Sequence, residues 1–147
     1  MTESSLLHEL PLFSAERAPE RPAVRFEGST LDYGELGSQM DRFSSGLLSL
    51  GVGRGERVAI YLEKRFEWVV AAFGAAAAGM VFVPVNPLLK PEQVGYILRD
   101  CGVCVLVTSP ERHAQLATEL QRCPTVRDVV LTGRAADDQT SSATLRT

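Results

Sequence analysis

The stretch VVAAFGAAAAGMVFVPV, residues 69–85, carries no charged side chain and largely decides the fold. It is shorter than the about 20 apolar residues that a membrane span requires, and it contains two glycines and a proline. The alanine-rich part up to Gly79 is typical of a buried helix, whereas MVFVP is typical of a buried strand. We therefore predict a helix that leads into a strand, with no membrane span.

The same alternation continues on both sides of this stretch. Apolar, β-branched runs predict strands at RVAIYL, MVFVP, VCVLV and DVVLT, and helical spacing predicts helices over residues 68–78, 91–101 and 110–120, with Leu116, Ala117 and Leu120 on the inner side of the last. Strands that are apolar throughout and alternate with helices are typical of a parallel sheet covered on both faces. The predicted fold class is α/β, with a partial parallel sheet and helices on both faces.

The N-terminal part predicts a different arrangement. Leu6, Leu10 and Phe13 have helical spacing, and Pro11 either kinks that helix or begins a shorter one. The runs PAVRF and STLDY flank Glu27-Gly28 and predict a small antiparallel hairpin. Asp32, with Glu35 three residues later, resembles a capping box at the start of a helix with an inner face of Leu36, Met40, Phe43, Leu47 and Leu50.

Composition limits the classes of function. The formal net charge of −3 offers no excess of positive charge for nucleic acid. Three cysteines and the lack of a leader-like start favour a reducing cytoplasm over a secreted disulfide scaffold. Residues 134–147 lack periodicity and predict a disordered tail or linker, so the predicted folded domain is residues 1–133.

Glycines 51, 53 and 55 suggest a phosphate-binding loop. The dinucleotide motif, however, follows a strand and opens a helix, whereas here a helix precedes and a strand follows, and Glu56 stands where the third glycine is needed. We interpret the segment as a turn that ends a helix.

Cys101 and Cys104 form a CxxC motif. A redox pair needs a helix N-terminus, whereas Cys101 is predicted at a helix C-terminus and Cys104 in a buried strand. A zinc site of Cys101, Cys104, His113 and Cys123 has enough ligands, but the last two are separated by a helix rather than forming a close pair. The favoured interpretation is that Cys104 is a free thiol in the core.

No nucleophile-and-base arrangement is visible. His8 and His113 are the only histidines, both predicted on surface-facing helices, and no Gly-x-Ser-x-Gly elbow occurs. The segment Glu63-Lys64-Arg65 follows a strand at the edge where α/β folds place ligands, with a solvated loop as the favoured alternative. The pairs Arg99-Asp100 and Glu111-Arg112 are predicted as exposed helix charges.

The order of five runs carries a family resemblance. AERAPERPAV, LDYGEL, LGVGRGERVAIYL, FEWVVAAFGAAAAGMVFVPVNP and PEQVGYILRDCGVCVLVT together resemble the N-terminal portion of AMP-forming acyl-CoA ligases, the adenylate-forming superfamily, from Leu6 to about Gly133. YLEKRFE and PVNPLLKPEQVG look most like bacterial ligases found near exosortase-type sorting systems. The sequence departs from the family at Asp32, where Thr or Ser is usual, and at Glu63-Lys64, where Pro-Asn is common.

The resemblance implies a fatty-acid ligase reaction that uses ATP, magnesium and CoA. The family's phosphate loop ending in Pro-Lys-Gly, its magnesium and ribose carboxylates, its acyl pocket and its C-terminal lysine have no counterpart in these residues. We therefore assign no catalytic, cofactor-binding or metal residue. The resemblance carries over only scaffold positions, which are Tyr33, Leu36, Gly79, Pro84 and Pro87.

Two functional hypotheses follow. In the first, the chain is an N-terminal segment of such a ligase, inactive alone. In the second, it is a non-catalytic binding subunit, whose open sheet edge pairs with a partner chain or with a second copy.

Overall fold

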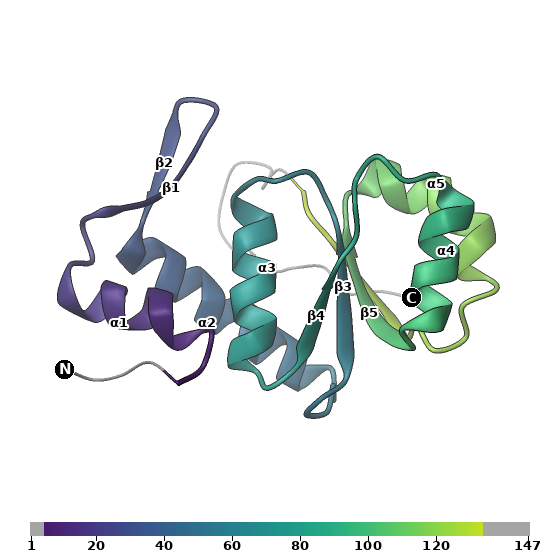
Figure 1. Ribbon diagram of the computed structural model, residues 1–147, viewed down its shortest axis with the longest axis horizontal. Coiled ribbons are helices and arrows are strands. Elements are labelled where there is room, and N and C mark those ends of the chain that lie inside the picture. Colours follow the sequence, from purple (N-terminus) through teal and green to yellow (C-terminus); the bar gives the residue numbers. More distant parts are fainter. Residues whose placement is uncertain (1–4, 134–147) are drawn as a thin grey trace. The chain divides into compact units, whose positions relative to one another are not determined.

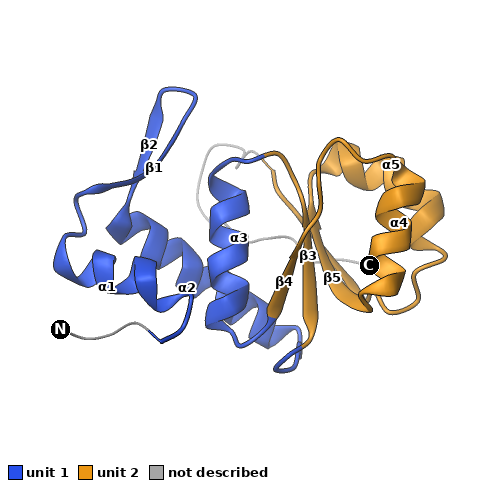
Figure 2. Cartoon of the chain, in the orientation of Figure 1, with its two compact units in different colours: residues 1–55, 64–80 blue, residues 56–63, 81–147 orange. Residues whose placement is uncertain are grey.

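The computed structural model describes residues 5–133 of the chain (Figure 1). Its elements, in chain order, are α1 (Glu9–Arg17), β1 (Pro22–Phe26), β2 (Ser29–Asp32), α2 (Tyr33–Ser49), β3 (Arg57–Tyr61), α3 (Phe66–Ala77), β4 (Val81–Pro84), α4 (Pro91–Asp100), β5 (Val103–Thr108), α5 (Pro110–Leu120) and β6 (Asp128–Leu131). Figure 2 shows two compact units. Unit 1 comprises residues 1–55 and 64–80, and unit 2 comprises residues 56–63 and 81–147.

Unit 1 contains the predicted hairpin. Strands β1 and β2 are antiparallel, with Phe26 opposite Ser29. The two residues between them, Glu27 and Gly28, both have positive φ angles, of 47° and 80°. Such a two-residue turn matches the right-handed twist of the flanking strands. It requires positive φ angles, and Gly28 adopts one without strain.

Helices α1, α2 and α3 complete unit 1. Pro11 is the third residue of α1, where no intrahelical N–H bond is needed, so it lies within a shorter helix without kinking it. The side chain of Asp32 accepts a hydrogen bond of 2.8 Å from the Glu35 N–H and caps α2, as predicted. The inner face of α2 contributes Leu36 and Met40 to a core cluster with Leu31 and Val70.

Unit 2 is built on a parallel sheet with the strand order β4-β3-β5-β6. Ala59 of β3 lies beside Val83 of β4 and Leu106 of β5. Every residue of β5 is buried, as are the last four residues of β3. Helices α4 and α5 lie on the same side of the sheet (Figure 1), where Leu98 and Leu116 are completely buried.

The expected α/β class, with a parallel sheet and a small N-terminal hairpin, is confirmed. Of the predicted inner face of α5, Leu116 and Leu120 are confirmed and Ala117 is wrong. Ala117 is exposed, and the buried polar residue Glu119 lies on the inner side of α5 with Leu116. The inner stripe passes through positions 116 and 119 because residues three apart share a helix face, and Glu119 tolerates burial there because it is ion-paired.

Helix α3 begins at Phe66, two residues before its predicted start, and β4 follows it after Gly79, which has a φ of 79°. The apolar run at 69–85 is thus a helix and a strand. Over residues 5–133, the helices are too short or too polar to cross a bilayer. The predicted tail, residues 134–147, lies outside the described residues.

Candidate functional site

The candidate site lies at the carboxyl edge of the sheet in unit 2. Strand β3 ends at Tyr61 and β5 ends at Thr108, and the two residues lie side by side in the parallel register. In open α/β sheets, ligands usually bind beyond this edge. Five residues gather here, and we call them the carboxyl-edge cluster: Tyr61, Glu63, Thr108, Ser109 and Arg112.

Arg112 is the centre of this cluster. Its Nη1 donates a hydrogen bond of 2.9 Å to the carbonyl oxygen of Pro87, and its Nη2 lies 3.1 Å from Oε1 of Glu63. Its guanidinium carbon lies 4.6 Å from the centroid of the Tyr61 ring, a cation–π arrangement. The side chain of Arg112 is 18% exposed, so its contacts with Pro87 and Tyr61 are largely shielded from water, whereas Glu63 is 69% exposed.

Tyr61 and Thr108 supply the buried hydrogen bonds of the cluster. The Tyr61 hydroxyl donates to the carbonyl oxygen of Leu89 at 3.0 Å, and the Thr108 hydroxyl donates to the carbonyl oxygen of Tyr61 at 2.9 Å. Thr108 is fully buried, and pairing is what makes a buried hydroxyl tolerable. Ser109 caps α5 through a 3.3 Å bond from the Arg112 N–H.

These bonds fix the segment that joins β4 to α4, residues 85–90. Arg112 holds Pro87 and Tyr61 holds Leu89, while Asn86 Oδ1 accepts from the Leu88 N–H at 2.9 Å. The side chain of Leu88, between the two anchored residues, is 88% exposed. The cluster therefore presents Leu88 to solvent on a backbone that is held at both sides.

The chemistry of the cluster is that of a scaffold. Arg112 is engaged by three groups, and across the described residues no buried side-chain nitrogen or oxygen lacks a hydrogen-bond partner. No histidine or cysteine belongs to the cluster, and its one carboxylate, Glu63, is 69% exposed and paired with Arg112. Nothing in this arrangement activates a nucleophile.

The Glu63-Lys64-Arg65 segment is divided by the structure. Glu63 belongs to unit 2 and joins the carboxyl-edge cluster. Arg65 belongs to unit 1 and pairs with Glu67 at 2.8 Å, at the start of α3. Lys64 is exposed. Only Glu63 therefore has a place at this edge of the sheet.

The glycine-rich segment is a turn, as predicted. Gly51 follows the end of α2 with a φ of 73°. Gly55 has a φ of 80°, and its N–H donates to the carbonyl oxygen of Gly79 at 2.9 Å. Strand β3 then starts at Arg57. The N–H of Gly55 is occupied by this backbone bond and is not free for a phosphate.

The cysteines do not converge. Cys101 is the C-cap of α4 and Cys104 is buried in β5, as predicted. The Cys104 thiol donates to the carbonyl oxygen of Arg57, and the Cys123 thiol lies near the carbonyl oxygens of Gly95 and Glu119. Among residues 5–133, no three His, Cys, Asp or Glu side chains are placed to hold a metal ion. Burial raises the pKa of the Cys104 thiol, which disfavours the thiolate that metal binding and redox chemistry require.

His8 and His113 are half-buried rather than fully surface-facing. His8 precedes α1 at the N-cap position, in unit 1, and His113 lies on α5, in unit 2. Neither lies in the carboxyl-edge cluster.

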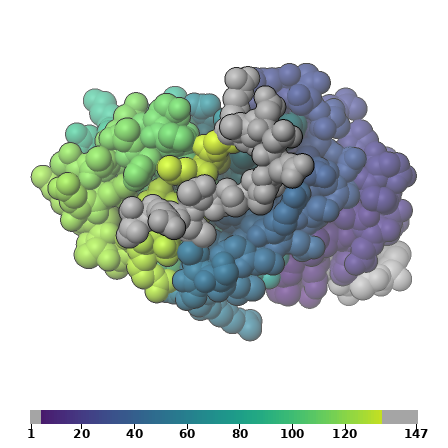
Figure 3. Space-filling model, turned by 180° about the vertical axis from the view of Figure 1, so that it is seen from behind, coloured from purple at the N-terminus to yellow at the C-terminus, as the bar shows by residue number. Residues whose placement is uncertain are grey.

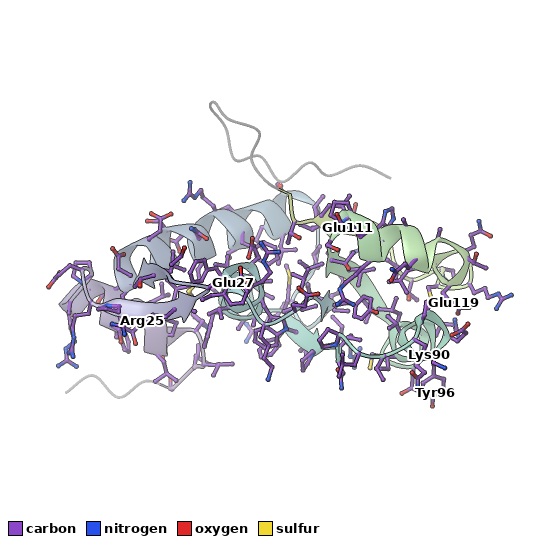
Figure 4. All side chains as sticks on the ribbon, turned by 90° about the horizontal axis from the view of Figure 1, so that it is seen from above. Arg25, Glu27, Lys90, Tyr96, Glu111 and Glu119 are labelled. Carbon is purple, nitrogen blue, oxygen red and sulfur yellow. The ribbon has the colours of Figure 1, made fainter. Side chains whose placement is uncertain are left out.

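Two charged positions with little solvent exposure were missed by sequence reasoning. Arg112, predicted as an exposed helix charge, is mostly buried, and Glu119 is buried in an ion pair of 3.2 Å with Arg99 of α4. Figure 4 shows Glu119 on the side of α5 nearest α4, whereas Tyr96 points outward from α4. Arg112 gives one usable signal: a cation in the first turn of a helix opposes the helix dipole, so a compensating partner is expected.

Comparison with known proteins places these features in a family. Residues 13–146 match the family described as AMP-binding enzyme. Surfactin synthase subunit 3 of Bacillus subtilis (strain 168) is 34% identical over 99 residues, which cover 67% of this chain and 8% of the synthase. The mitochondrial medium-chain acyl-CoA ligase ACSF2 of Pongo abelii is 33% identical over 117 residues, which cover 77% of this chain and 19% of the ligase.

Solved structures agree. The anthranilate CoA ligase AuaEII, determined in complex with anthranoyl-AMP, superposes with a TM-score of 0.83 and 25% identity over 87% of this chain and 25% of its own. VinN, in complex with 3-methylaspartate, gives a TM-score of 0.75 and 30% identity over 85% of this chain and 34% of its own. The chain thus spans about a third or less of the length of each of these relatives.

Proposed function

The chain belongs to the AMP-binding enzyme family, and from this membership we propose that it forms the N-terminal part of the large domain of an AMP-forming acyl-CoA ligase. In the proposed reaction, a carboxylate attacks the α-phosphate of ATP and releases pyrophosphate to give an acyl-adenylate, and the thiol of CoA then takes the acyl group and releases AMP. A fatty acid is the proposed substrate class, and the cytoplasm of a bacterium is the proposed location. The exosortase-associated subgroup is the finer proposal.

One observation carries the choice of a ligase. The fold matches a CoA ligase with a TM-score of 0.83, and a second CoA ligase, which acts on benzoate, with a TM-score of 0.80. The family also contains peptide synthases, such as the surfactin synthase subunit, which shares 34% identity. We favour the ligases on this structural match, in which the superposition with AuaEII covers 87% of this chain.

The residues in hand supply scaffold rather than chemistry. Magnesium prefers carboxylate oxygens, and no cluster of three His, Cys, Asp or Glu side chains occurs within residues 5–133. The glycine turn at 51–55 precedes a strand and uses a backbone N–H internally. We therefore derive no step through ATP or magnesium from these side chains, and propose that this chain alone has no ligase activity.

The test uses the purified chain. It is incubated with ATP, magnesium, CoA and fatty acids of several lengths, and AMP is measured against a reaction without protein. We expect no AMP above that control, and AMP production that depends on the fatty acid contradicts the proposed inactivity. Independently, the reading frame downstream of codon 147 is sequenced. A glycine-rich loop ending in Pro-Lys-Gly supports the ligase assignment, and its absence from a long continuing frame opposes that assignment.

A second candidate function is a binding subunit without catalysis. Its support lies in the sheet of unit 2, where β4 and β6 are the end strands and Val81 of β4 is 50% exposed. An uncovered end strand offers unpaired N–H and C=O groups to another chain. Size-exclusion chromatography with light scattering tests this, since a compact monomer at all concentrations contradicts self-association.

A further inference from the structure

Unit 1 contains a pocket that the proposed function does not use. It is a half-open hollow of about 400 Å³ where the end of α1 meets the hairpin and the start of α2. We call it the α1–β1 pocket, and it is lined by Ser14, Arg17, Ala18, Arg21, Pro22 and Tyr33. All of these residues belong to unit 1, so the pocket is complete within one compact body.

The charged side chains that line this pocket are all positive. Two arginines line it and no carboxylate does, although Glu16 and Glu20 are neighbours of these arginines in the chain. Of the eleven arginines within residues 5–133, six form ion pairs, and Arg17 and Arg21 are among the five that do not. Two exposed arginines at one hollow, with no carboxylate in its lining, favour an anion.

The remaining polar groups suit the same ligand. Tyr33 also lines the pocket and carries a hydroxyl donor, and it is the first residue of α2, at the positive end of the helix dipole. The Ser14 hydroxyl already donates to the carbonyl oxygen of Leu10 at 3.0 Å. Arg17, Arg21 and Tyr33 are therefore the groups available to donate into the pocket.

The backbone around the pocket is held in place. The Tyr33 N–H donates to the carbonyl oxygen of Arg21 at 3.0 Å, and the Gly34 N–H donates to that of Pro19 at 2.9 Å. The Arg21 N–H closes a turn onto Ala18. A framework fixed in this way reduces the entropy lost when the arginine side chains close on a ligand.

We propose that the α1–β1 pocket binds a phosphate monoester group, with Arg17 and Arg21 as its two guanidinium partners and Tyr33 as a hydroxyl donor. A phosphate dianion matches two positive charges and accepts from both planar guanidinium groups, whereas a carboxylate neutralises only one of them. This site is independent of the proposed ligase chemistry. The phosphate can belong to a soluble molecule or to a lipid headgroup.

The experiment measures binding of inorganic phosphate to the full chain by nuclear magnetic resonance. Amide shifts of Ser14, Ala18 and Tyr33 are followed at constant ionic strength, with acetate as the comparison anion. We expect saturable shifts with phosphate, weakened about tenfold or more by Arg17→Gln and by Arg21→Gln. Arg25→Gln is the matched control, because Arg25 is an exposed arginine of β1 that does not line the pocket (Figure 4).

A second arm distinguishes the source of the phosphate. Sedimentation with phosphatidylcholine vesicles containing phosphatidic acid is compared with pure phosphatidylcholine vesicles. Binding to inorganic phosphate supports a soluble ligand, and binding to the acidic vesicles alone supports a headgroup, provided that both arginine variants weaken it.

No binding in either arm overturns the proposal, as does an equal effect of Arg25→Gln or equal affinity for acetate. If a glutamine variant unfolds, Arg17→Lys replaces it, and an unchanged affinity in that variant also overturns the proposal.

Discussion

In unit 2, the guanidinium carbon of Arg112 lies 4.6 Å from the ring centroid of Tyr61. The same guanidinium group binds the carbonyl oxygen of Pro87, and the Tyr61 hydroxyl binds that of Leu89. The two side chains, in contact with each other, thus anchor the segment between β4 and α4 from two elements that are distant in sequence. They couple the end of β3 to the first turn of α5.

Arg112→Ala is expected to destabilise the chain by about 2 kcal/mol. The substitution removes a shielded cation–π contact and leaves the carbonyl oxygen of Pro87 without its donor. Urea unfolding followed by circular dichroism, which reports on the helices and strands of both units, measures the change. Glu63→Gln is the matched control, because Glu63 is 69% exposed and its loss is expected to cost less than about 0.5 kcal/mol. Equal effects of the two substitutions contradict the role of Arg112.

Gly95→Ala is expected to cost about 1–3 kcal/mol through overpacking between α4 and α5. A Cβ at position 95 would lie closer than van der Waals contact to the Glu119 carboxylate and 3.1 Å from the Glu119 Cβ. Glu119 cannot move freely because it is buried and paired with Arg99. Thermal unfolding followed by circular dichroism measures the effect.

The control for that substitution is Gly46→Ala. Gly46 lies within α2, and a Cβ there meets nothing within 4 Å. Because alanine restricts the unfolded chain and favours helix, this variant is expected to gain about 0.4–1 kcal/mol. Opposite signs at positions 95 and 46 distinguish a steric cause from a general intolerance of alanine.

Two substitutions in the hairpin turn are expected to change stability in opposite directions. Glu27 adopts a φ of 47°, which asparagine tolerates better than glutamate, so Glu27→Asn is expected to stabilise by about 0.5 kcal/mol. Gly28→Ala is expected to cost about 1 kcal/mol, because its φ is 80° although the space around it is open. Equilibrium unfolding of both variants tests this. A stabilising Gly28→Ala is the contrary result.

The buried thiol of Cys104 is expected to make the free energy of unfolding depend on pH. Burial is the main cause that raises the pKa of its thiol, and the nearby Glu56 adds to it. Above the pKa of the unfolded state, the unfolded chain loses this proton while the folded chain keeps it, so stability falls as pH rises. Between about pH 8 and 10, the free energy of unfolding should decline more steeply in the wild type than in Cys104→Ala. Parallel pH profiles would refute this contribution.

Helix α5 is mostly exposed, with two charged exceptions. Figure 3 shows α5, in light green, on the outside of the molecule, and most of its residues are exposed. Its two charged exceptions, Arg112 and Glu119, are seven residues apart and so lie on one helical face. That face was predicted to be apolar. Its burial could not be inferred because a charged residue is assigned to solvent unless its partner is known.

Local chemistry determined most of the secondary structure. The hairpin turn at Glu27-Gly28, the cap at Asp32 and the helix start at Pro91 were predicted correctly because each depends on neighbours within three residues. The parallel sheet also followed from sequence, since apolar runs alternating with helices leave few other arrangements. These features, and the family resemblance based on their order, needed no tertiary information.

Tertiary structure alone decided which polar residues act together. Arg112 meets Glu63 across 49 positions and Pro87 across 25, and Arg99 meets Glu119 across 20. Arg17 and Arg21 share a pocket with Tyr33 only because the backbone of the hairpin returns to the end of α1. A sequence specifies which side chains are charged, but their burial, pairing and shared hollows depend on contacts between distant segments, which exist only once the chain has folded.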